Sequence, residues 1–336
     1  MHRLAAVLSA ALIALGIGIG PAAPARADCS GTNMFEELQP SEQAALRSSA
    51  EAQPFAQGNF WRASRGDESL TLIGTYHFDD PRHDPTLAAL RPLIAEAPAL
   101  LVEAGPEEEA ALMQALSDNP GLIFINDGPS LLDRLPPDTW KRLSEALEAR
   151  GIPGVMAARF QPWYATVVLA LAPCALESGQ TPRGLDGMLI EAAGALSVPV
   201  RALEPYDTLF AIFEGFDERQ EIDMIESSLA MEGRSEDFAA TLADLYFAGE
   251  SRLIWELMRE LSYGQPGYSR EEVDAEMAVM EEAMMTRRNL AWIPVIEAAA
   301  AEGPPVVAFG ALHLSGEAGV LNLLAERGWT LEPLPF

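Results

Sequence analysis

Two stretches far apart in the chain share one pattern of apolar and polar positions. Residues 70–77 read Leu-Thr-Leu-Ile-Gly-Thr-Tyr-His, and residues 305–313 read Pro-Val-Val-Ala-Phe-Gly-Ala-Leu-His. Each is an apolar, β-prone run that ends in a glycine and, three residues later, a histidine. A short polar loop, a helical pattern and a second apolar strand follow in both places. The sequence therefore predicts two strand–Gly-x-x-His–helix–strand units, related by pseudo-symmetry around one cleft.

The bounds of these units follow from the same periodicity. In the first unit we expect a helix over residues 86–97 and a strand over 99–103. In the second we expect a helix over residues 317–327 and a strand over 329–332. Residues 208–262 carry apolar positions at helical spacing with no strand signal, which predicts an inserted helical region. The predicted fold is α/β (α+β), in one domain.

Shorter patterns predict further elements between and around the two units. Residues 59–64 predict a strand that forms a hairpin with the first apolar run, and residues 120–127 predict a short apolar strand. A helix over residues 188–196 leads to a strand over 199–204. This strand ends on a glutamate, as the strand over 99–103 does.

The first 27 residues have the pattern of an export signal. A basic start at Arg3 is followed by an apolar run from Leu4 to Ile19, and then by Ala-Arg-Ala at residues 25–27. The apolar run is shorter than the roughly 20 residues that a membrane-spanning helix needs. We therefore expect a signal peptide over 1–27, a mature domain over 28–336, a periplasmic or secreted location, and no stable membrane anchor after cleavage.

Composition and charge narrow the classes of partner. The chain has 50 acidic and 22 basic residues, a formal net charge of −28, and 49% hydrophobic residues. Such a balance excludes nucleic acid as a partner, because its binding relies on Lys and Arg at the phosphates. The two cysteines, Cys29 and Cys174, would meet an oxidising compartment after export. They predict one disulfide, with two unpaired thiols as the alternative.

Three side chains could form a metal site. His77 and His313 occupy the same place in the two tips, and Glu103 ends an apolar strand where a carboxylate needs a partner. Histidine is both the usual proton carrier near neutral pH and the commonest metal ligand. Gly74 and Gly310, three residues before the histidines, permit close approach of the backbone. A metal held by two histidines and one carboxylate can keep open positions for a water that attacks a carbonyl.

Three more side chains are candidates for a supporting role. Asp186 and Glu204 could join the metal ligands or orient the histidines. Arg288 could stabilise an oxyanion or a substrate carboxylate, and its alternative role is an ion pair with a glutamate of its own helix. The chain has no His-Glu-x-x-His, Gly-x-Ser-x-Gly or Walker motif. The familiar zinc-peptidase and serine-hydrolase templates are therefore absent.

Taken together, six motifs resemble the TraB/GumN family, which is related to the Tiki metalloproteases and, more distantly, to erythromycin-esterase-like hydrolases. They are Gly74-Thr75-Tyr76-His77, Leu101-Val102-Glu103, Gly184-Leu185-Asp186, Leu203-Glu204, Arg288-Asn289 with Trp292, and the stretch from Gly310 to Gly319. The resemblance implies a pseudo-symmetric α/β domain and divalent-metal-dependent peptide hydrolysis. It also implies ligand or catalytic positions at His77, Glu103 and His313, with Arg288 as the basic group.

We therefore expect an exported metal-dependent hydrolase that cleaves a peptide or a related amide or ester bond, with manganese, cobalt or zinc as the metal. One alternative is a metal-free hydrolase in which His77 acts as general base. The other is a non-catalytic periplasmic accessory protein of polysaccharide biosynthesis or export, which would bind a glycan in the cleft. The expected partner is accordingly a peptide or small-molecule substrate, or a glycan.

Overall fold

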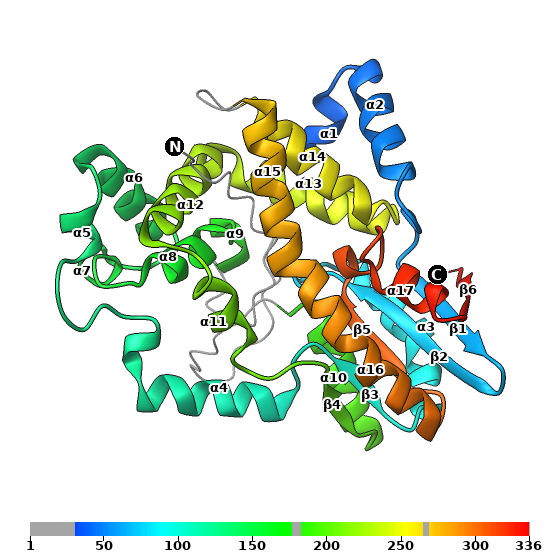
Figure 1. Cartoon of the computed structure of the whole chain (residues 1–336). Coiled ribbons are helices and arrows are strands. Elements are labelled where there is room, and N and C mark those ends of the chain that lie inside the picture. Colours follow the sequence, from blue (N-terminus) through cyan, green and yellow to red (C-terminus); the bar gives the residue numbers. More distant parts are fainter. Residues whose placement is uncertain (1–30, 177–182, 265–268, 336) are drawn as a thin grey trace.

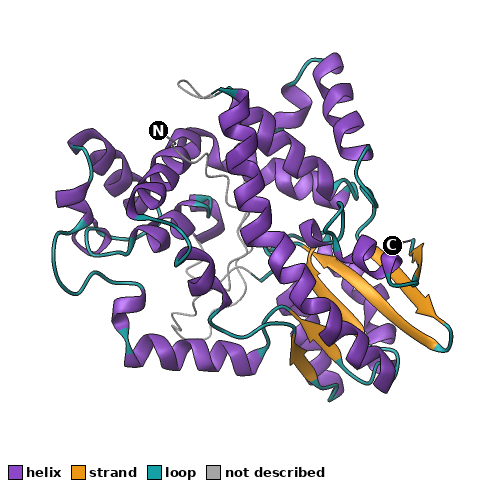
Figure 2. Ribbon diagram, in the orientation of Figure 1, coloured by secondary structure: helices purple, strands orange, loops and turns teal. Residues whose placement is uncertain are grey.

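The core of the protein is a six-stranded sheet whose strands run in the order β4-β3-β5-β2-β1-β6 (Figures 1 and 2). The computed structural model describes residues 31–176, 183–264 and 269–335. Its strands are β1 (Phe60–Arg65), β2 (Glu68–Thr75), β3 (Leu100–Val102), β4 (Val200–Ala202), β5 (Val306–Gly310) and β6 (Thr330–Pro333). Strands alternating with helices confirm the predicted α/β class.

The two apolar runs of the sequence become neighbouring strands. β2 and β5 pair in parallel, with Gly74 opposite Phe309 and Thr75 opposite Gly310, and β3 pairs in parallel with the other side of β5. β1 is antiparallel to β2, as the predicted hairpin requires, and its turn contains Gly66 at φ 60°. The carboxyl ends of β2, β5, β3 and β4 therefore lie at one edge of the sheet.

Helices cover both faces of this sheet. α3 (His83–Glu96) and α10 (Leu185–Leu196) pack their apolar side chains on one face, against Ile73, Leu100 and Ala308. α16 (Arg287–Glu302) and α17 (Val320–Glu326) pack on the other face, where Trp292 is completely buried. Every residue of β3 and β5 is buried, as expected for the central strands of a mostly parallel sheet with helices on both faces.

The remaining helices lie beside the sheet, and most of them contribute to two further apolar clusters (Figure 1). They are α1 (Met34–Glu37), α2 (Pro40–Glu51), α4 (Pro106–Asp118), α5 (Leu131–Arg134), α6 (Pro137–Glu148), α7 (Gly154–Ala157), α8 (Pro162–Leu169), α9 (Pro173–Leu176), α11 (Thr208–Phe213), α12 (Glu218–Met231), α13 (Ser235–Phe247), α14 (Ser251–Tyr263) and α15 (Arg270–Glu281), with the 3₁₀ turns η1 (Pro120–Leu122), η2 (Glu232–Arg234) and η4 (Ala311–His313). The predicted helical region over 208–262 is confirmed. Among the residues described, no helix combines the length and apolar character that crossing a bilayer requires.

A π-helical segment, η3 (Glu282–Thr286), joins α15 to α16 without a break in the helical run. Each i→i+5 hydrogen bond widens the turn by one residue, and such segments concentrate at functional sites. Here the segment ends at Thr286, two residues before Arg288. The carbonyl of Met284, inside the segment, accepts a hydrogen bond from the Arg288 side chain.

Two expectations need correction, and others fall outside the described residues. Residues 120–127 do not form a strand, because Pro120 begins the 3₁₀ turn η1 and only a single bridge joins Phe124 to Phe160. α17 begins at Val320 rather than at residue 317, because the chain first makes the 3₁₀ turn η4. The signal peptide and Cys29 lie outside the described residues, so the disulfide stays a prediction; Cys174 is buried in α9.

The two units contain the predicted elements, but their connections cross different numbers of strands. The first runs β2–α3–β3 and crosses over β5, whereas the second runs β5–α17–β6 and crosses over β2 and β1. Their glycines are also offset by one residue in the β2–β5 register. The pseudo-symmetry between the units stays a prediction.

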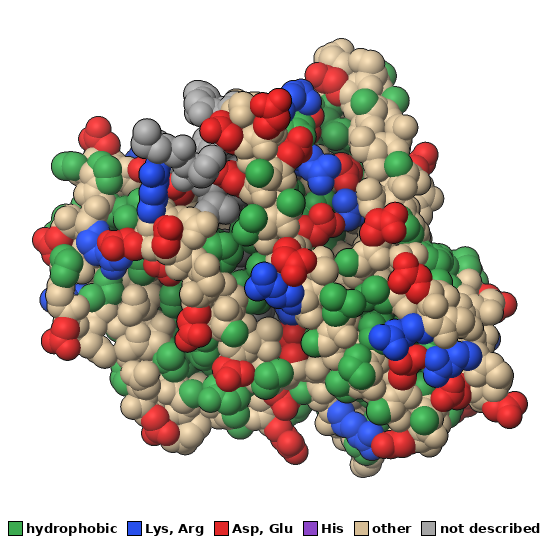
Figure 3. Space-filling model, viewed as in Figure 1, with side chains coloured by type: hydrophobic (Ala, Val, Ile, Leu, Met, Phe, Trp, Pro, Cys, Tyr) green, Lys and Arg blue, Asp and Glu red, His purple; other side chains and the backbone are tan. Residues whose placement is uncertain are grey.

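Acidic side chains are spread over the face of the molecule in Figure 3, over the helical clusters as well as the sheet. Lys and Arg appear on this face in small separate groups. Many are paired, as Arg65 is with Glu68 and Glu297. The large negative charge is thus dispersed on this face rather than gathered at one place.

Candidate functional site

Four adjacent strand ends bring the predicted side chains together. His77 follows β2, His313 ends the 3₁₀ turn η4 after β5, Glu103 follows β3, and Glu204 lies two residues beyond β4. Because these strands are parallel neighbours, their carboxyl ends deliver all four residues to one edge of the sheet. This edge is where α/β sheets place their ligands.

Arg288, at the start of α16, is the centre of the cluster and is 7% exposed. Its Nε and Nη2 donate to the two carboxylate oxygens of Glu204 at 2.9 and 2.7 Å, and Nη2 also donates to Glu103 Oε2 at 2.5 Å. Nη1 donates to the Met284 carbonyl at 3.2 Å and approaches His313 Nε2 at 3.2 Å. All five N–H groups of the guanidinium therefore have a partner.

These contacts decide between the two roles considered for Arg288. Its ion-pair partners are the strand-end glutamates Glu103 and Glu204, and the alternative of a glutamate on its own helix is wrong. The indole of Trp292, one helical turn further on, lies beneath the guanidinium at 5.0 Å and donates to Glu204 at 2.9 Å. A role in binding an oxyanion would require one of the existing hydrogen bonds of Arg288 to break.

Arg288 forms ion pairs with two buried carboxylates, and the pKa values of these carboxylates shift in opposite directions. Burial alone would raise the pKa of Glu103, but the charge of Arg288, the nearby histidines and the Gly310 N–H hold it well below its ordinary value. Burial raises the pKa of Glu204, and the charge of Glu103 adds to this effect against the hydrogen bonds from Arg288. Burial alone would lower the pKa of Arg288, but the two glutamates hold this pKa above its ordinary value. Glu103 is therefore the carboxylate held in its ionised form.

His313 has both ring nitrogens engaged. Because arginine can only donate, His313 Nε2 accepts from Arg288, and the ring proton on Nδ1 is donated to Asn289 Oδ1 at 2.6 Å. Asn289 is itself held by a hydrogen bond to the Ala318 carbonyl at 2.8 Å. Burial and the charge of Arg288 lower the pKa of His313 to about 3. His313 is therefore a neutral, fixed imidazole.

His77 is held in a different way, by the first turn of α10. Its Nδ1 lies 3.1 Å from Asp186 Oδ1, and the backbone N–H of Leu185 donates to the Tyr76 carbonyl at 2.9 Å. A Cβ on Gly184 would come within 2.3 Å of the His77 backbone, so a glycine is required for α10 to approach this closely. Burial would lower the pKa of His77, but Asp186 and Glu103 raise it to about 9.

The space that a side chain at position 310 would take lies beside His77 and Glu103. A Cβ at this position would lie 3.0 Å from His77 Nε2 and 3.3 Å from Glu103 Oε1, and the Gly310 N–H donates to that same oxygen at 2.6 Å. Gly74 is different, because its missing side chain makes room for Leu314 and Ala311. Only one of the two motif glycines thus borders the chemically active side chains.

The fit of the site to a metal can be judged from its donors. His77 Nε2 and Glu103 Oε1 both border the space at Gly310, while Asp186 supports the other nitrogen of His77, an arrangement common for metal-binding histidines. Three carboxyl groups, those of Glu103, Glu204 and Asp186, lie near the single guanidinium of Arg288, so the local balance of charge favours a cation. His313, however, offers no free nitrogen. No group of three or more His, Cys, Asp or Glu placed to hold a metal occurs among the described residues.

The model of the TraB/PrgY/gumN family matches residues 59–333, which is most of the chain. The chain belongs to the TraB/PrgY/gumN family. No curated protein matches it.

Two features of this TraB/PrgY/gumN site could not be predicted from the sequence. Asn289 holds the proton of His313, and the only sequence signal for it is that it follows Arg288 in a recognised motif. The π-helical segment Glu282–Thr286 has no clear signal, because its residues continue the helical pattern of their neighbours. Its Met284 carbonyl nevertheless fixes the guanidinium.

Proposed function

We propose that this member of the TraB/PrgY/gumN family is an exported, metal-dependent hydrolase that cleaves a peptide or a related amide or ester bond. The observation that carries the proposal is that His77 Nε2 and Glu103 Oε1 meet beside Gly310, 3.0 and 3.3 Å from the position that a Cβ would take there. A ring nitrogen oriented by one carboxylate, with a second carboxylate beside the same glycine, suits both metal binding and the handling of water.

His77 and Glu103 are the residues that would hold a divalent cation such as manganese, cobalt or zinc. When bound, such a cation supplies Lewis acidity toward a carbonyl. Asp186 bonds to Nδ1 of His77 and so holds the ring with Nε2 beside Gly310. The Gly310 N–H and Arg288 bind the two oxygens of Glu103 and hold the carboxylate in place and ionised.

The remaining members of the cluster position these two. Arg288 is anchored by both oxygens of Glu204, and Trp292 and Met284 complete its surroundings. His313, which the sequence predicts as a ligand, instead accepts from Arg288 and donates to Asn289. We therefore assign His313 and Arg288 to positioning and restrict the proposed protein ligands to His77 and Glu103.

The test is the metal content of protein purified without chelator, compared between wild type, His77→Ala and His313→Gln. We expect metal in the wild type, its loss in His77→Ala, and its retention in His313→Gln, because glutamine can still accept from Arg288. Loss of metal in both variants would show that His313 is a ligand as well, as the sequence predicts. Cleavage would be sought with a peptide library, before and after removal of metal by chelation.

One observation favours a second candidate, a metal-free hydrolase. The His77–Asp186 pair at 3.1 Å is also the arrangement of a histidine general base oriented by a carboxylate. Wild-type protein that holds no metal after soaking with manganese, cobalt or zinc, yet still hydrolyses a substrate, would establish this candidate. Glycan binding without hydrolysis, unaffected by Glu103→Gln, would instead support the accessory role in polysaccharide export.

A further inference from the structure

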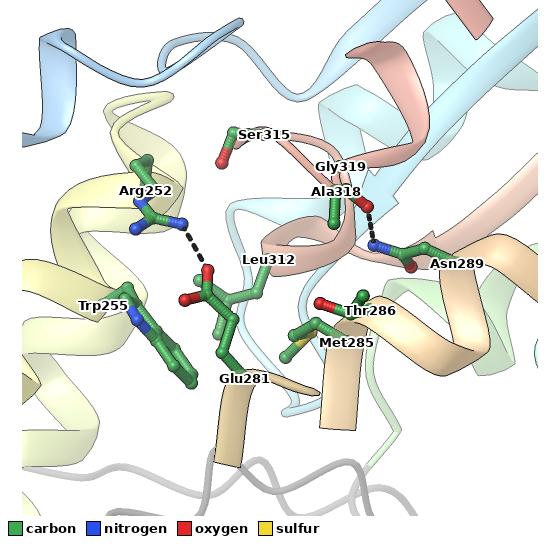
Figure 4. Close-up of a pocket in the computed structure, with 10 residues that line it drawn as sticks. All are labelled: Arg252, Trp255, Glu281, Met285, Thr286, Asn289, Leu312, Ser315, Ala318 and Gly319. Atoms are coloured by element: carbon green, nitrogen blue, oxygen red, sulfur yellow. Dashed lines mark hydrogen bonds and ion pairs between the residues drawn. The ribbon is translucent and has the colours of Figure 1, made fainter. Parts of the chain in front are cut away.

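The two histidines of the site are fixed in different ways. Both ring nitrogens of His313 have partners, and Asn289, which binds its Nδ1 proton, is held in turn by the Ala318 carbonyl (Figure 4). Among the residues described, the ring of His77 has a hydrogen-bond partner only at Nδ1, where it meets Asp186. The place of His77 Nε2 therefore depends more closely on the backbone that carries the ring, which is the end of β2.

Three buried residues tie the end of β2 to α13 through a closed loop of hydrogen bonds. The N–H of Gly74 donates to the Asn59 carbonyl at 2.6 Å, and Asn59 Nδ2 donates to the Tyr246 carbonyl at 2.7 Å. Tyr246 closes the loop, because its hydroxyl donates to the Gly74 carbonyl at 2.9 Å. Ser251 donates to Asn59 Oδ1 and so fixes the orientation of the amide. In this loop the Tyr246 hydroxyl is the group of α13 that binds β2 directly.

Tyr246 also contacts the residue that precedes His77. Its ring stacks on the ring of Tyr76, with the centroids 5.5 Å apart and an interplanar angle of 24°. The Tyr76 carbonyl accepts from the N–H of Leu185, in the first turn of the helix α10 that carries Asp186. The short segment that leads into His77 is therefore held by two helices, α13 and α10.

The Tyr246 hydroxyl is a permanent donor. Burial raises the pKa of this phenol, and the charge of Asp186 adds to the effect, so the hydroxyl keeps its proton at any pH near neutrality. A phenylalanine would fill almost the same space in the core. What the hydroxyl adds is a directed hydrogen bond to one carbonyl of β2.

We propose that Tyr246 is a positioning residue of the site, an inference that rests on the proposed function. Through the Gly74 carbonyl and the Tyr76 ring, it sets where β2 ends and so where His77 Nε2 meets Glu103. Metal–ligand distances vary by only about 0.2 Å, so a small displacement of a ligand weakens binding. Residues that orient metal ligands are typically worth about 10–100-fold in metal affinity. Because Tyr246 acts through the backbone rather than on the ring of His77, we expect an effect of about tenfold.

The test is Tyr246→Phe, which keeps the ring and leaves the Gly74 carbonyl without its donor. The first measurement follows the ring signals of the histidines by ¹⁵N NMR in metal-free mature protein, where the signals absent from His77→Ala identify His77. We expect these signals to shift and broaden, while those of His313, whose ring is bound at both nitrogens, stay in place. The second measurement is the dissociation constant for manganese, which should rise about tenfold.

Thr166→Val is the matched control, because the Thr166 hydroxyl is also buried but donates to the Pro162 carbonyl within α8. It should leave both measurements unchanged, and urea unfolding compares the stability of the two variants. A Tyr246→Phe protein that loses stability but keeps the His77 signals and the manganese affinity of wild type would overturn the proposal, because the hydroxyl would then stabilise the fold alone. If wild type binds no manganese, the proposed metal site is wrong, and the His77 signals alone support or overturn the role of Tyr246.

Discussion

The two motif glycines offer a sharp test, because the sequence treats them alike and the structure does not. In Gly310→Ala the new methyl would fill the space beside His77 Nε2 and Glu103 Oε1, at 3.0 and 3.3 Å. In Gly74→Ala it would instead meet Leu314 Cδ1 at 2.6 Å and the Ala311 Cα at 3.0 Å. Alanine is thus expected to remove function at one position and stability at the other.

The magnitudes follow from the surroundings of each glycine. Gly310 has φ −50° and ψ 133°, which alanine adopts without strain, and the reduced freedom of the unfolded chain contributes about 0.4–1 kcal/mol of stability. The two tight contacts offset this gain, so the free energy of unfolding should change by less than about 1 kcal/mol. The contacts of Gly74 lie in the core, where Leu314 is 1% exposed and cannot move aside. Overpacking there should cost about 1–3 kcal/mol.

The loss of function in Gly310→Ala should be far larger than its change in stability. A methyl group at position 310 would crowd both His77 Nε2 and Glu103 Oε1. Because the proposed chemistry depends on these two atoms, we expect hydrolysis to fall at least about 100-fold. Urea unfolding followed by circular dichroism measures stability, and cleavage of a library peptide together with metal content measures function. Gly194→Ala is the control, since a Cβ there meets nothing within 4 Å. Full cleavage and full metal content in Gly310→Ala would refute the proposed role of His77 and Glu103 beside this glycine.

Three further predictions concern charge. Arg288→Met should reduce the free energy of unfolding by about 3–5 kcal/mol, because two buried carboxylates lose their cation; a loss below about 1 kcal/mol in urea unfolding would contradict the described ion pairs. Asp186→Asn should lower the pKa of His77 from about 9 to below about 6.5, because burial remains while the charge is lost; NMR titration of the histidine ring in metal-free protein measures it, and an unchanged pKa would show that Asp186 has no such effect. Burial, strengthened by nearby carboxylates, raises the pKa of Glu221 to about 7, so the folded state holds a proton that the unfolded state has released above about pH 4.5. Stability should therefore fall as the pH rises from about 4.5 to 7, and urea unfolding of Glu221→Gln should show a shallower fall; equal slopes would rule out this source of the pH dependence.

The sequence predicted the parts of the site that depend on strand ends. His77, Glu103, Glu204 and His313 each follow a short apolar, β-prone run, which is the sequence signal of a buried strand. Parallel pairing of β2 with β5 then brings the residues together, as the repeat of one motif suggested. The family resemblance is confirmed over residues 59–333.

The parts that the sequence did not predict depend on contacts between distant elements. Nothing near Arg288 in the chain shows that its guanidinium is enclosed by Glu103, Glu204 and His313, since those residues come from three different strand ends. The predicted strand over 120–127 failed for a local reason, because Pro120 and Asn119 favour a capped turn over an extended segment. Apolar composition alone could not distinguish the two.

The place of β5 in the chain governs when the sheet can close. This strand lies between β3 and β2, yet its residues, 306–310, come far later in the chain than the residues of either neighbour. Until it arrives, the middle of the sheet is open, and His77 and Glu103 lack the glycine backbone that separates them. Closing so long a loop is entropically slow. The meeting of His77 and Glu103 beside Gly310 therefore depends on a late, long-range step of folding.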